Sequence, residues 1–461
     1  MKLIMTPPPV PHPTQSFPDN FVWGVATSSF QIEGAPAEDG KGPSIWDTFC
    51  RQPGAIADAS NGDVACDHYH RLEQDLNLIA ALGVDAYRFS VSWPRVQPLG
   101  HGEWNPKGLD FYQRLVDGLI ARGIKPYLTL NHWDLPQALQ DRGGWTDRDT
   151  VHRFTDYALG MDRVLGDRIA AVTTHNEPWV MAVLGHESGI FAPGQKSRAA
   201  ANQVAHHLLL SHGLALQALR AQGSRSRLGI VLNLSPVQPA TDSAADHAQA
   251  RLEDGKLLRW YMDPLFKASY PQDVLDYLGA DAPQVQDGDM AAIATPMDFM
   301  GINYYSRSVA SADGSWCAET SGLPLTDMGW EIYPRGLSDL LVRMHRDYPV
   351  PPLYVTENGG AFRDVLEGDR VHDRDRTEYI AAHIAAVGDA LAQGVPMEGY
   401  MVWSLLDNFE WASGYAKRVG IVHVDYDTQR RTPKDSALWY AEFLRAQQAA
   451  RADAGHLLVG A

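Results

Sequence analysis

Cysteine is scarce in this sequence, which has only three among its 461 residues: Cys50, Cys66 and Cys317. They form no CxxC pair, and an odd number cannot all pair within the chain. This argues against a disulfide framework, and unpaired thiols are typical of a reducing compartment.

Long apolar runs are absent as well. No stretch approaches the ~18 apolar residues of a membrane-spanning helix. The first residues, MKLIMTPPPVPHP, contain neither an apolar core of signal-peptide length nor a small-residue cleavage site. We therefore expect a cytoplasmic protein with no membrane partner.

Acidic residues outnumber basic ones: the chain has 56 Asp and Glu and 39 Lys and Arg, which gives a formal net charge of -17. Nucleic acids and anionic membrane surfaces need a basic patch, so neither is expected as a partner. There is no Gly-rich phosphate loop, so a nucleotide cofactor is not indicated. Residues 66–70, CDHYH, resemble a metal cluster, but no second ligand group has a recognisable spacing. We expect no metal and no other cofactor.

Short β-branched or aromatic runs alternate with longer helix-like stretches. The expected strands are Phe21–Ala26, Asp85–Ser90, Lys125–Asn131, Ala171–Asn176, Leu228–Asn233, Asp298–Asn303, Leu353–Thr356 and Gly399–Ser404. Amphipathic stretches include Leu109–Arg122, with Leu115, Leu119 and Ile120 at helical spacing, and Thr377–Ala392. Eight strands separated by helices predict an α/β fold, a single (β/α)8 TIM barrel with its active site at the carboxyl ends of the strands.

No linker divides the chain, and barrels with insertions reach this length as one unit. We expect a catalytic barrel over residues 17–446, between a loose N-terminal segment (1–16) and a loose C-terminal tail (447–461). Gly/Pro/Asp-rich stretches at 36–64, 312–328 and 361–376 are expected to form loops over one barrel face.

Polar and aromatic residues stand at the ends of the expected strands. These positions are Gln31, Arg88, Asn131–His132–Trp133, Asn176–Glu177, Asn303–Tyr304–Tyr305, Glu357–Asn358, Trp403 and Glu410–Trp411. In a barrel the carboxyl ends of the strands converge on one face, so we expect these side chains to meet there.

Two of these residues are glutamates, at the ends of the fourth and seventh strands. Paired carboxyl groups are what glycosidic cleavage needs, since one donates a proton to the leaving oxygen and the other attacks the anomeric carbon. Arg88 and Tyr305 are candidates to keep one carboxylate ionised, and tryptophans offer flat faces for a pyranose ring.

The segments FVWGVATSSFQIEGA, YRFSVSWPRV, LNHWDLP, NEPW, GINYY, YVTENG and WSLLDNFEW resemble glycoside hydrolase family 1, and the resemblance extends from about Phe17 to Leu444. It implies a retaining β-glucosidase with Glu177 as acid/base and Glu357 as nucleophile. We expect the pKa of Glu177 to be raised, mainly by the ionised Glu357 and by partial burial.

The resemblance also implies roles for the surrounding residues. Asn176 would bind the 2-hydroxyl, Trp403 would lie under the sugar ring, and Trp330 would stack on the leaving-group side. Arg88 and Tyr305 would support the nucleophile. The expected substrate-binding residues are Gln31, His132, Trp133, Asn176, Asn303, Tyr305, Trp330, Trp403, Glu410 and Trp411.

The sequence departs from the family pattern at a few positions. His175 stands where an apolar residue is common, which is expected to alter the packing beneath Glu177 and so its pKa. Phe191 and Val419 replace common residues, and Val419 leaves the preference among glucosides, galactosides and fucosides open. Glu410 stands where members of the family that act on 6-phosphoglycosides have residues that bind the phosphate. Since a glutamate would repel a 6-phosphate, we expect an unphosphorylated sugar.

The expected reaction is hydrolysis of terminal β-D-glucosyl residues from a small β-glucoside or a short β-linked oligosaccharide such as cellobiose, which is chemistry of cellulose degradation. Two alternatives remain: a transglycosylating β-glycosidase, and a non-catalytic sugar-binding protein on the same fold. The sequence leaves open whether the protein is a monomer or a homo-oligomer.

Overall fold

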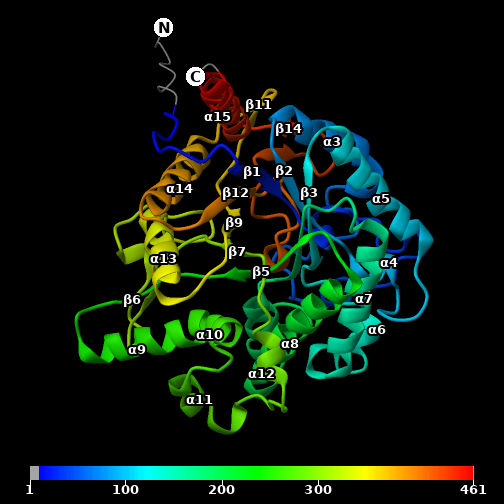
Figure 1. The fold of residues 1–461 in the computed structure, drawn as a ribbon, viewed down its shortest axis with the longest axis vertical. Coiled ribbons are helices and arrows are strands. Elements are labelled where there is room, and N and C mark those ends of the chain that lie inside the picture. The colour runs from blue at the N-terminus through cyan, green and yellow to red at the C-terminus, as the bar shows by residue number, and fades with distance from the viewer. Residues whose placement is uncertain (1–9, 460–461) are drawn as a thin grey trace.

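Eight parallel strands form a closed barrel in the computed structural model, which describes residues 10–459. The order around the barrel is β1-β12-β9-β7-β5-β4-β3-β2, so each barrel strand pairs with its neighbours in the chain and the last closes on the first (Figure 1). Their bounds are β1 Val22–Ala26, β2 Ala86–Ser90, β3 Lys125–Asn131, β4 Ala171–Asn176, β5 Arg227–Asn233, β7 Phe299–Asn303, β9 Leu353–Asn358 and β12 Met397–Trp403. The prediction of a single TIM barrel is confirmed, with strand ends shifted by at most two residues.

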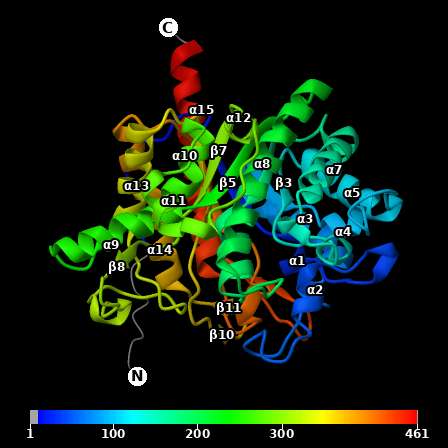
Figure 2. The same ribbon diagram turned by 90° about the horizontal axis from the view of Figure 1, so that it is seen from below.

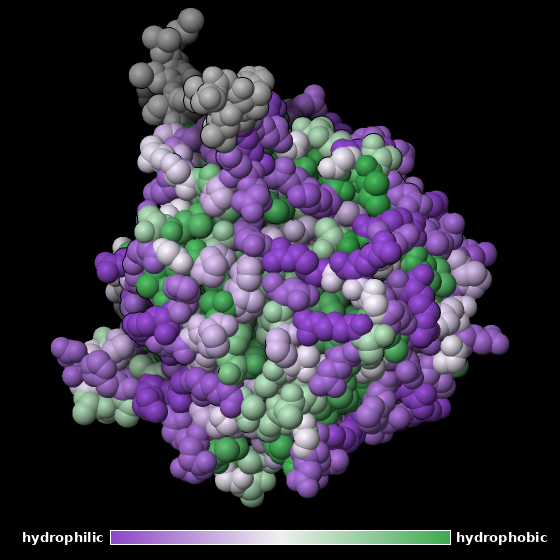
Figure 3. Space-filling view, in the orientation of Figure 1, coloured by the Kyte–Doolittle hydropathy of each residue, from purple (hydrophilic) through white to green (hydrophobic). Residues whose placement is uncertain are grey.

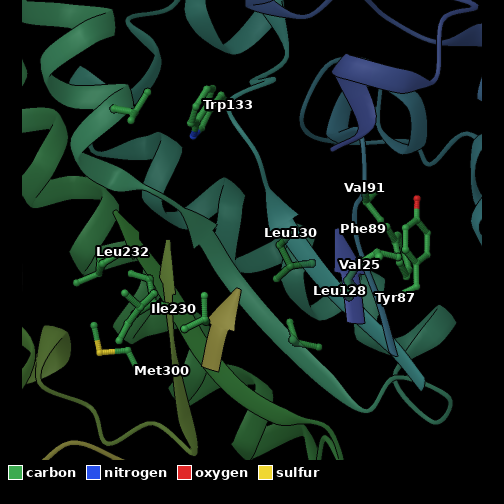
Figure 4. Packing of buried hydrophobic residues seen from close by; sticks show 14 of the residues in the cluster. Val25, Tyr87, Phe89, Val91, Leu128, Leu130, Trp133, Ile230, Leu232 and Met300 are labelled. Carbon is green, nitrogen blue, oxygen red and sulfur yellow. The ribbon is translucent and has the colours of Figure 1, made fainter. Parts of the chain in front are cut away.

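Side chains alternate between the inside of the barrel and the helix layer, as the two-residue period of a strand requires. Leu128, Leu130, Ile230 and Met300 are buried in the large apolar layer outside the strands (Figure 4). A second apolar cluster, which includes Phe299, Met401 and Trp403, is formed by the opposite faces of the strands. The same inner faces carry polar residues toward their carboxyl ends, and this is where the site forms.

Helices surround the strands (Figures 1 and 2). The longest are α3 His68–Leu82, α5 Pro106–Ala121, α7 Asp149–Leu165, α8 Arg198–Gln222, α13 Pro334–Asp347, α14 Arg374–Ala392 and α15 Asp435–Val459. In α5, proline occupies the first turn, where its missing N–H costs nothing, and Phe111, Leu115 and Leu119 face the barrel. Ile120 was expected on this apolar stripe, but 44% of it is exposed; Val116 is buried instead.

The β-to-α connections carry the remaining elements. Short helices are α1 Ser29–Ile32, α2 Ile45–Phe49, α4 Trp93–Val96, α6 Gln137–Gln140, α9 Ala244–Asp254, α10 Trp260–Lys267, α11 Gln272–Leu278 and α12 Asp289–Ile293. Two π-helical segments are η3 Val180–Glu187 and η4 Gly255–Arg259. Small sheets pair β6 Val237–Pro239 with β8 Ser308–Ala310, β10 Leu366–Glu367 with β11 Arg370–Val371, and β13 Val422–Val424 with β14 Arg431–Pro433. In the described part of the chain, 3-10 turns lie at Glu38–Gly40, Gly144–Thr146, Gly279–Asp281, Ala318–Thr320 and Trp411–Ser413.

Within residues 10–459, parts of both segments predicted as loose form regular structure or packing contacts. Helix α15 continues to Val459, so the stretch predicted as a loose tail from residue 447 is helical up to that point; residues 460–461 lie outside the described part. Near the other end, the ring of His12 packs on Trp439 and Phe443, and the carbonyl of Val10 accepts from the indole N–H of Trp439. Residues 1–9 of the segment predicted as loose are likewise outside the described part.

Hydrophilic side chains cover most of the face in Figure 3, and hydrophobic residues form small separate areas between them. Between residues 10 and 459, no helix is both long and apolar enough to cross a membrane. His68 and His70, from the segment that resembles a metal cluster, instead bond to nearby carboxylates: His68 to Asp75, and His70 to Asp67 and Glu38.

Candidate active site

Glu357 lies near the carboxyl end of β9 and is 3% exposed. Its Oε1 accepts from Nη1 of Arg88 at 2.6 Å, and its Oε2 accepts from the hydroxyl of Tyr305 at 2.6 Å. Burial raises the pKa of Glu357, while the guanidinium and the phenol act against that rise. Burial also raises the pKa of Tyr305 far above its ordinary value, so the phenol keeps the proton that it donates.

Glu177 follows β4 directly and is 5% exposed. Its Oε1 accepts from Nδ2 of Asn303 at 2.6 Å. The pKa of Glu177 is raised to about 8, first by burial and second by the charge of Glu357. Both expected causes are therefore present, and desolvation is the larger because the carboxyl group is almost wholly removed from water.

Asn176 connects the two glutamates indirectly, because it bonds to Arg88, the partner of Glu357, and to Asn303, the partner of Glu177. Its Oδ1 accepts from Nη2 of Arg88 at 2.6 Å and from Asn303 at 3.0 Å, so its amide nitrogen must point the other way. There Nδ2 lies 3.1 Å from Nε2 of His132, which accepts the bond. The proton of His132 is therefore on Nδ1, and this buried N–H has no protein partner in the described structure. Burial and Arg88 hold the pKa of His132 well below its usual range, so the ring is neutral.

Gln31 lies on α1 and is fully buried. Its Oε1 accepts from the hydroxyl of Ser28 at 2.6 Å, and its Nε2 donates to Asn408 and to the carbonyl of Phe409, both at 3.0 Å. A longer contact of 3.5 Å reaches Oε2 of Glu410. The pKa of Glu410 is raised to about 8 by desolvation and by Glu357.

Four tryptophans predicted for the site surround these polar groups. Trp133 and Trp411 lie 4.4 Å apart between ring centroids, and the ring of Trp403 is nearly parallel to His132 at 5.7 Å. Trp330 is 40% exposed and lies 5.6 Å from the ring of Tyr305, at the open side. Trp133, Trp411 and Glu177 have positive φ angles of 78°, 47° and 52°, which is unfavourable for side-chain-bearing residues and typical of functional sites.

These side chains enclose a cavity of about 230 Å³, called here the catalytic cavity. The predicted residues that line it are His132, Trp133, Glu177, Tyr305, Trp330, Glu357, Trp403, Glu410 and Trp411. The other four, Gln31, Arg88, Asn176 and Asn303, are not among the lining residues, but each bonds to one of them. All thirteen predicted residues therefore belong to one connected cluster.

Other lining residues were not predicted. Trp179 belongs to the NEPW segment, and Asn233 ends β5, so the rule that strand ends carry the site would have found Asn233. Met328, Gly360 and Ala361 come from loops, where no periodicity marks them. Lining residues also include Phe191 and Val419, the two noted departures from the family pattern.

His175, the third noted departure, does not contact Glu177. Its Nδ1 accepts from Asn131 at 3.1 Å and its Nε2 donates to Ser211 at 2.8 Å. The ring stacks on Phe154 at 4.4 Å. It fills the layer between β4 and the outer helices as a neutral, fully bonded side chain, and it is not among the groups that shift the pKa of Glu177.

Two buried carboxyl groups with different hydrogen-bond partners, amide and imidazole groups and a tryptophan wall match what a glycosidase needs. The sequence profile of Glycosyl hydrolase family 1 matches residues 13–449. The chain belongs to glycosyl hydrolase family 1. The expected resemblance to this family, and to its β-glucosidase type, is confirmed.

Relatives of this family 1 enzyme share nearly its whole length. "Beta-glucosidase A" of Thermotoga maritima is 45% identical over 437 residues, which cover 94% of this chain and 98% of the relative. The "Bifunctional beta-D-glucosidase/beta-D-fucosidase" of Bifidobacterium breve is 42% identical, covering 94% and 98%. A solved structure of the Thermotoga maritima β-glucosidase with glucoimidazole superposes with a TM-score of 0.91 at 44% identity, covering 94% of this chain and 99% of the other.

Proposed function

We propose that this family 1 enzyme is a retaining β-glucosidase that removes terminal β-D-glucosyl residues by double displacement. The proposal rests on one observation: two buried glutamates have different hydrogen-bond partners and therefore different tendencies to ionise. Glu357 bonds to a guanidinium and a phenol, which favour its ionised form, whereas the pKa of Glu177 is raised to about 8. Two carboxyl groups with such different environments divide the roles of nucleophile and acid between them.

In the first step, a carboxylate oxygen of Glu357 attacks the anomeric carbon. The bond to the leaving oxygen breaks, and Glu177 gives that oxygen its proton. In the second step, Glu177 takes a proton from water, and the resulting hydroxide displaces Glu357 from the anomeric carbon. The sugar leaves with its original configuration. This double displacement predicts a separation of about 5–5.5 Å between the two carboxyl groups.

Sugar recognition follows from the free donors and acceptors of the site. The unpartnered Nδ1–H of His132 and the second Nδ2 hydrogen of Asn176 face hydroxyl groups. Gln31, Glu410 and Trp411 bind the hydroxyls at the closed end, and Trp403 lies under the apolar face of the ring. Trp330, on the exposed side, stacks on the leaving group.

The substrate is an uncharged sugar, such as cellobiose or an aryl β-glucoside. Among the described residues that line the catalytic cavity there is no lysine or arginine to neutralise a 6-phosphate, and the carboxylate of Glu357 would repel it. The bifunctional relative supports β-fucosides as further substrates. The three free cysteines support a cytoplasmic location.

A panel of aryl β-glucoside, β-galactoside, β-fucoside and β-6-phosphoglucoside tests the proposal. We expect the glucoside to be hydrolysed, with the β-anomer as the first product by NMR. Absence of hydrolysis of every member would leave the sugar-binding alternative, and release of the α-anomer would contradict retention. Product analysis at high cellobiose concentration separates hydrolysis from transglycosylation.

A further inference from the structure

Tyr305 donates the hydrogen bond to Oε2 of Glu357, but it lies two residues beyond the end of β7. The ladder of the barrel therefore does not fix its backbone. Toward the open side its ring meets Trp330, which is itself 40% exposed. A bond of 2.6 Å needs a donor that is held in place, so its support must come from the side behind the cavity.

Three backbone hydrogen bonds hold Tyr305 and the residue before it from that side. The N–H of Tyr304 donates to the carbonyl of Glu357 at 3.0 Å. The carbonyl of Tyr304 accepts from Nδ2 of Asn358 at 2.7 Å, and the carbonyl of Tyr305 accepts from the hydroxyl of Tyr379 at 2.8 Å. Asn358 follows the nucleophile on β9, and Tyr379 lies on α14, outside the barrel (Figure 1).

The side chains behind these bonds form a chain in which each donor has one acceptor. The hydroxyl of Tyr400 on β12 donates to Oδ1 of Asn358 at 2.6 Å. The amide nitrogen of Asn358 must face the carbonyl of Tyr304, since a carbonyl cannot donate, and it lies 3.3 Å from the hydroxyl oxygen of Tyr379. The one proton of Tyr379 is then used on Tyr305. We call Tyr400, Asn358 and Tyr379 the support cluster.

The support cluster is buried and uncharged. Its three side chains are at most 1% exposed, so no bulk water replaces a hydroxyl that is lost there. The ring of Tyr379 stacks on His383 at 3.9 Å, and burial lowers the pKa of this histidine to about 4, which leaves it neutral. Burial also raises the pKa of Tyr379, so the phenol keeps its proton. The cluster therefore acts on Glu357 through geometry and not through charge.

The charged and titratable groups that bond to Glu357 or line the catalytic cavity with it are all outside the support cluster. They are Arg88 on β2, His132 after β3, Glu177 after β4, Tyr305 after β7 and Glu410 after β12. Of these, only Tyr305 is bonded to the support cluster through its own backbone. A change in the cluster therefore reaches the nucleophile by way of Tyr305.

We propose that Tyr379, oriented by Asn358 and Tyr400, is a positioning residue for the nucleophile: it fixes the backbone of Tyr305 so that the phenol stays on Oε2 of Glu357. The inference rests on the proposed role of Glu357 and adds to it a residue of the helix layer that does not touch the sugar. Because strand β9 carries both Glu357 and Asn358, the nucleophile and the support of its donor are held by the same strand.

Tyr379→Phe tests the inference, since it removes the hydroxyl and keeps the ring on His383. A less firmly held phenol stabilises the carboxylate less, while Arg88 still does so. We expect the acidic limb of kcat/KM for an aryl β-glucoside to move up by about half a pH unit, which is a loss of about threefold on the acidic side. Tyr400→Phe is expected to move the limb in the same direction by a smaller amount.

Tyr440→Phe is the matched control. Its hydroxyl is also buried and donates to a backbone carbonyl of the barrel, that of Gly24 at 3.1 Å, far along the chain from the support cluster. Thermal unfolding of both variants measures the cost of losing such a bond. We expect a shifted acidic limb in Tyr379→Phe alone. Equal shifts in both variants, or a shift in neither, would overturn the inference.

A double variant tests whether Tyr379 acts through Tyr305. In Tyr305→Phe the donor is already absent, so adding Tyr379→Phe is expected to leave the acidic limb where the single Tyr305→Phe variant has it. Shifts that add would overturn the inference. An active wild-type enzyme with an unshifted Tyr379→Phe variant removes only the positioning role, whereas a wild-type enzyme that hydrolyses no aryl β-glucoside removes the proposed function as well.

Discussion

The side-chain amide of Asn303 donates a hydrogen bond to Oε1 of Glu177 across 2.6 Å. This bond stabilises the ionised carboxylate, and so it lowers the pKa of Glu177 against the rise caused by burial and by Glu357. The same Nδ2 donates to Asn176, and Oδ1 of Asn303 accepts from Thr356 at 2.8 Å, so the amide is held in one orientation. The pKa of Glu177 is therefore a balance between desolvation and the charge of Glu357, which raise it, and the bond from Asn303, which lowers it.

Replacing Asn303 by leucine is expected to move the alkaline limb of the kcat/KM profile to higher pH. Loss of a donor to the carboxylate raises the pKa of Glu177 further above about 8, so the acid keeps its proton longer as the pH rises. A pH series with an aryl β-glucoside measures this. Thr356→Val, which removes the partner of Asn303 but keeps its donor, is the matched control with a smaller shift. A limb that moves down would contradict the stated role.

The barrel was predictable because its strands obey a simple local rule. A strand that is buried on both faces is a short β-branched run, and in a barrel its carboxyl end carries the functional group. Asn303, Glu357 and Trp403 follow that rule, whereas Arg88 lies in the middle of β2 and its long side chain reaches Glu357. The partners of each group, in contrast, are set by strands that are distant in sequence, such as the contact from Arg88 on β2 to Glu357 on β9.

The connections were harder to predict, for a physical reason. Residues such as Met328 and Ala361 reach the catalytic cavity through irregular loops, where neither helical nor strand periodicity applies. Burial was also misjudged: Ile120 faces solvent although its spacing is helical, and Glu177 is more buried than a strand-end carboxylate was expected to be. Both depend on how neighbouring elements pack, which is tertiary information.

Glu177→Gln is expected to spare substrates with good leaving groups and to damage those with poor ones, by about 10²–10⁴-fold, because only the latter need a proton at the departing oxygen. The pH profile of kcat/KM for the residual activity should also lose its decline at alkaline pH. Glu410 has a pKa of about 8 as well, so Glu410→Gln is the necessary control. If the limb disappears in that variant and not in Glu177→Gln, Glu177 is not the titrating acid.

Glu357→Ala is expected to abolish turnover by several orders of magnitude on every substrate, whatever the leaving group, since the covalent intermediate can no longer form. Measurement of kcat for an aryl β-glucoside and for cellobiose checks this. Substantial activity remaining on either would remove Glu357 from the role of nucleophile.

Tyr305→Phe removes one donor from Glu357 without changing the shape of the ring. The pKa of Glu357 should rise, because the phenol lowers it in the wild-type enzyme. Glu357 must be ionised to attack, so the acidic limb of kcat/KM is expected to move to higher pH, with a loss of about tenfold near that limb. An unchanged acidic limb would show that Arg88 alone determines the charge of the nucleophile.

Lys434→Met is expected to destabilise the fold by about 3 kcal/mol, because it removes the buried cation that Asp407 and Asp364 share and leaves them only Arg418 and Arg376. The ammonium group of Lys434 is fully buried and lies 2.7 Å from Asp407, which is also fully buried. Asp407 precedes Asn408, whose Oδ1 accepts from Gln31, so the change should also raise KM for the glucoside. Urea unfolding and steady-state kinetics measure the two effects. The control is Lys107→Met at the exposed Lys107–Asp39 pair, where solvent screens the interaction and the unfolding midpoint should hardly move. If both variants unfold at the wild-type midpoint, the buried charge network does not support this side of the sugar site.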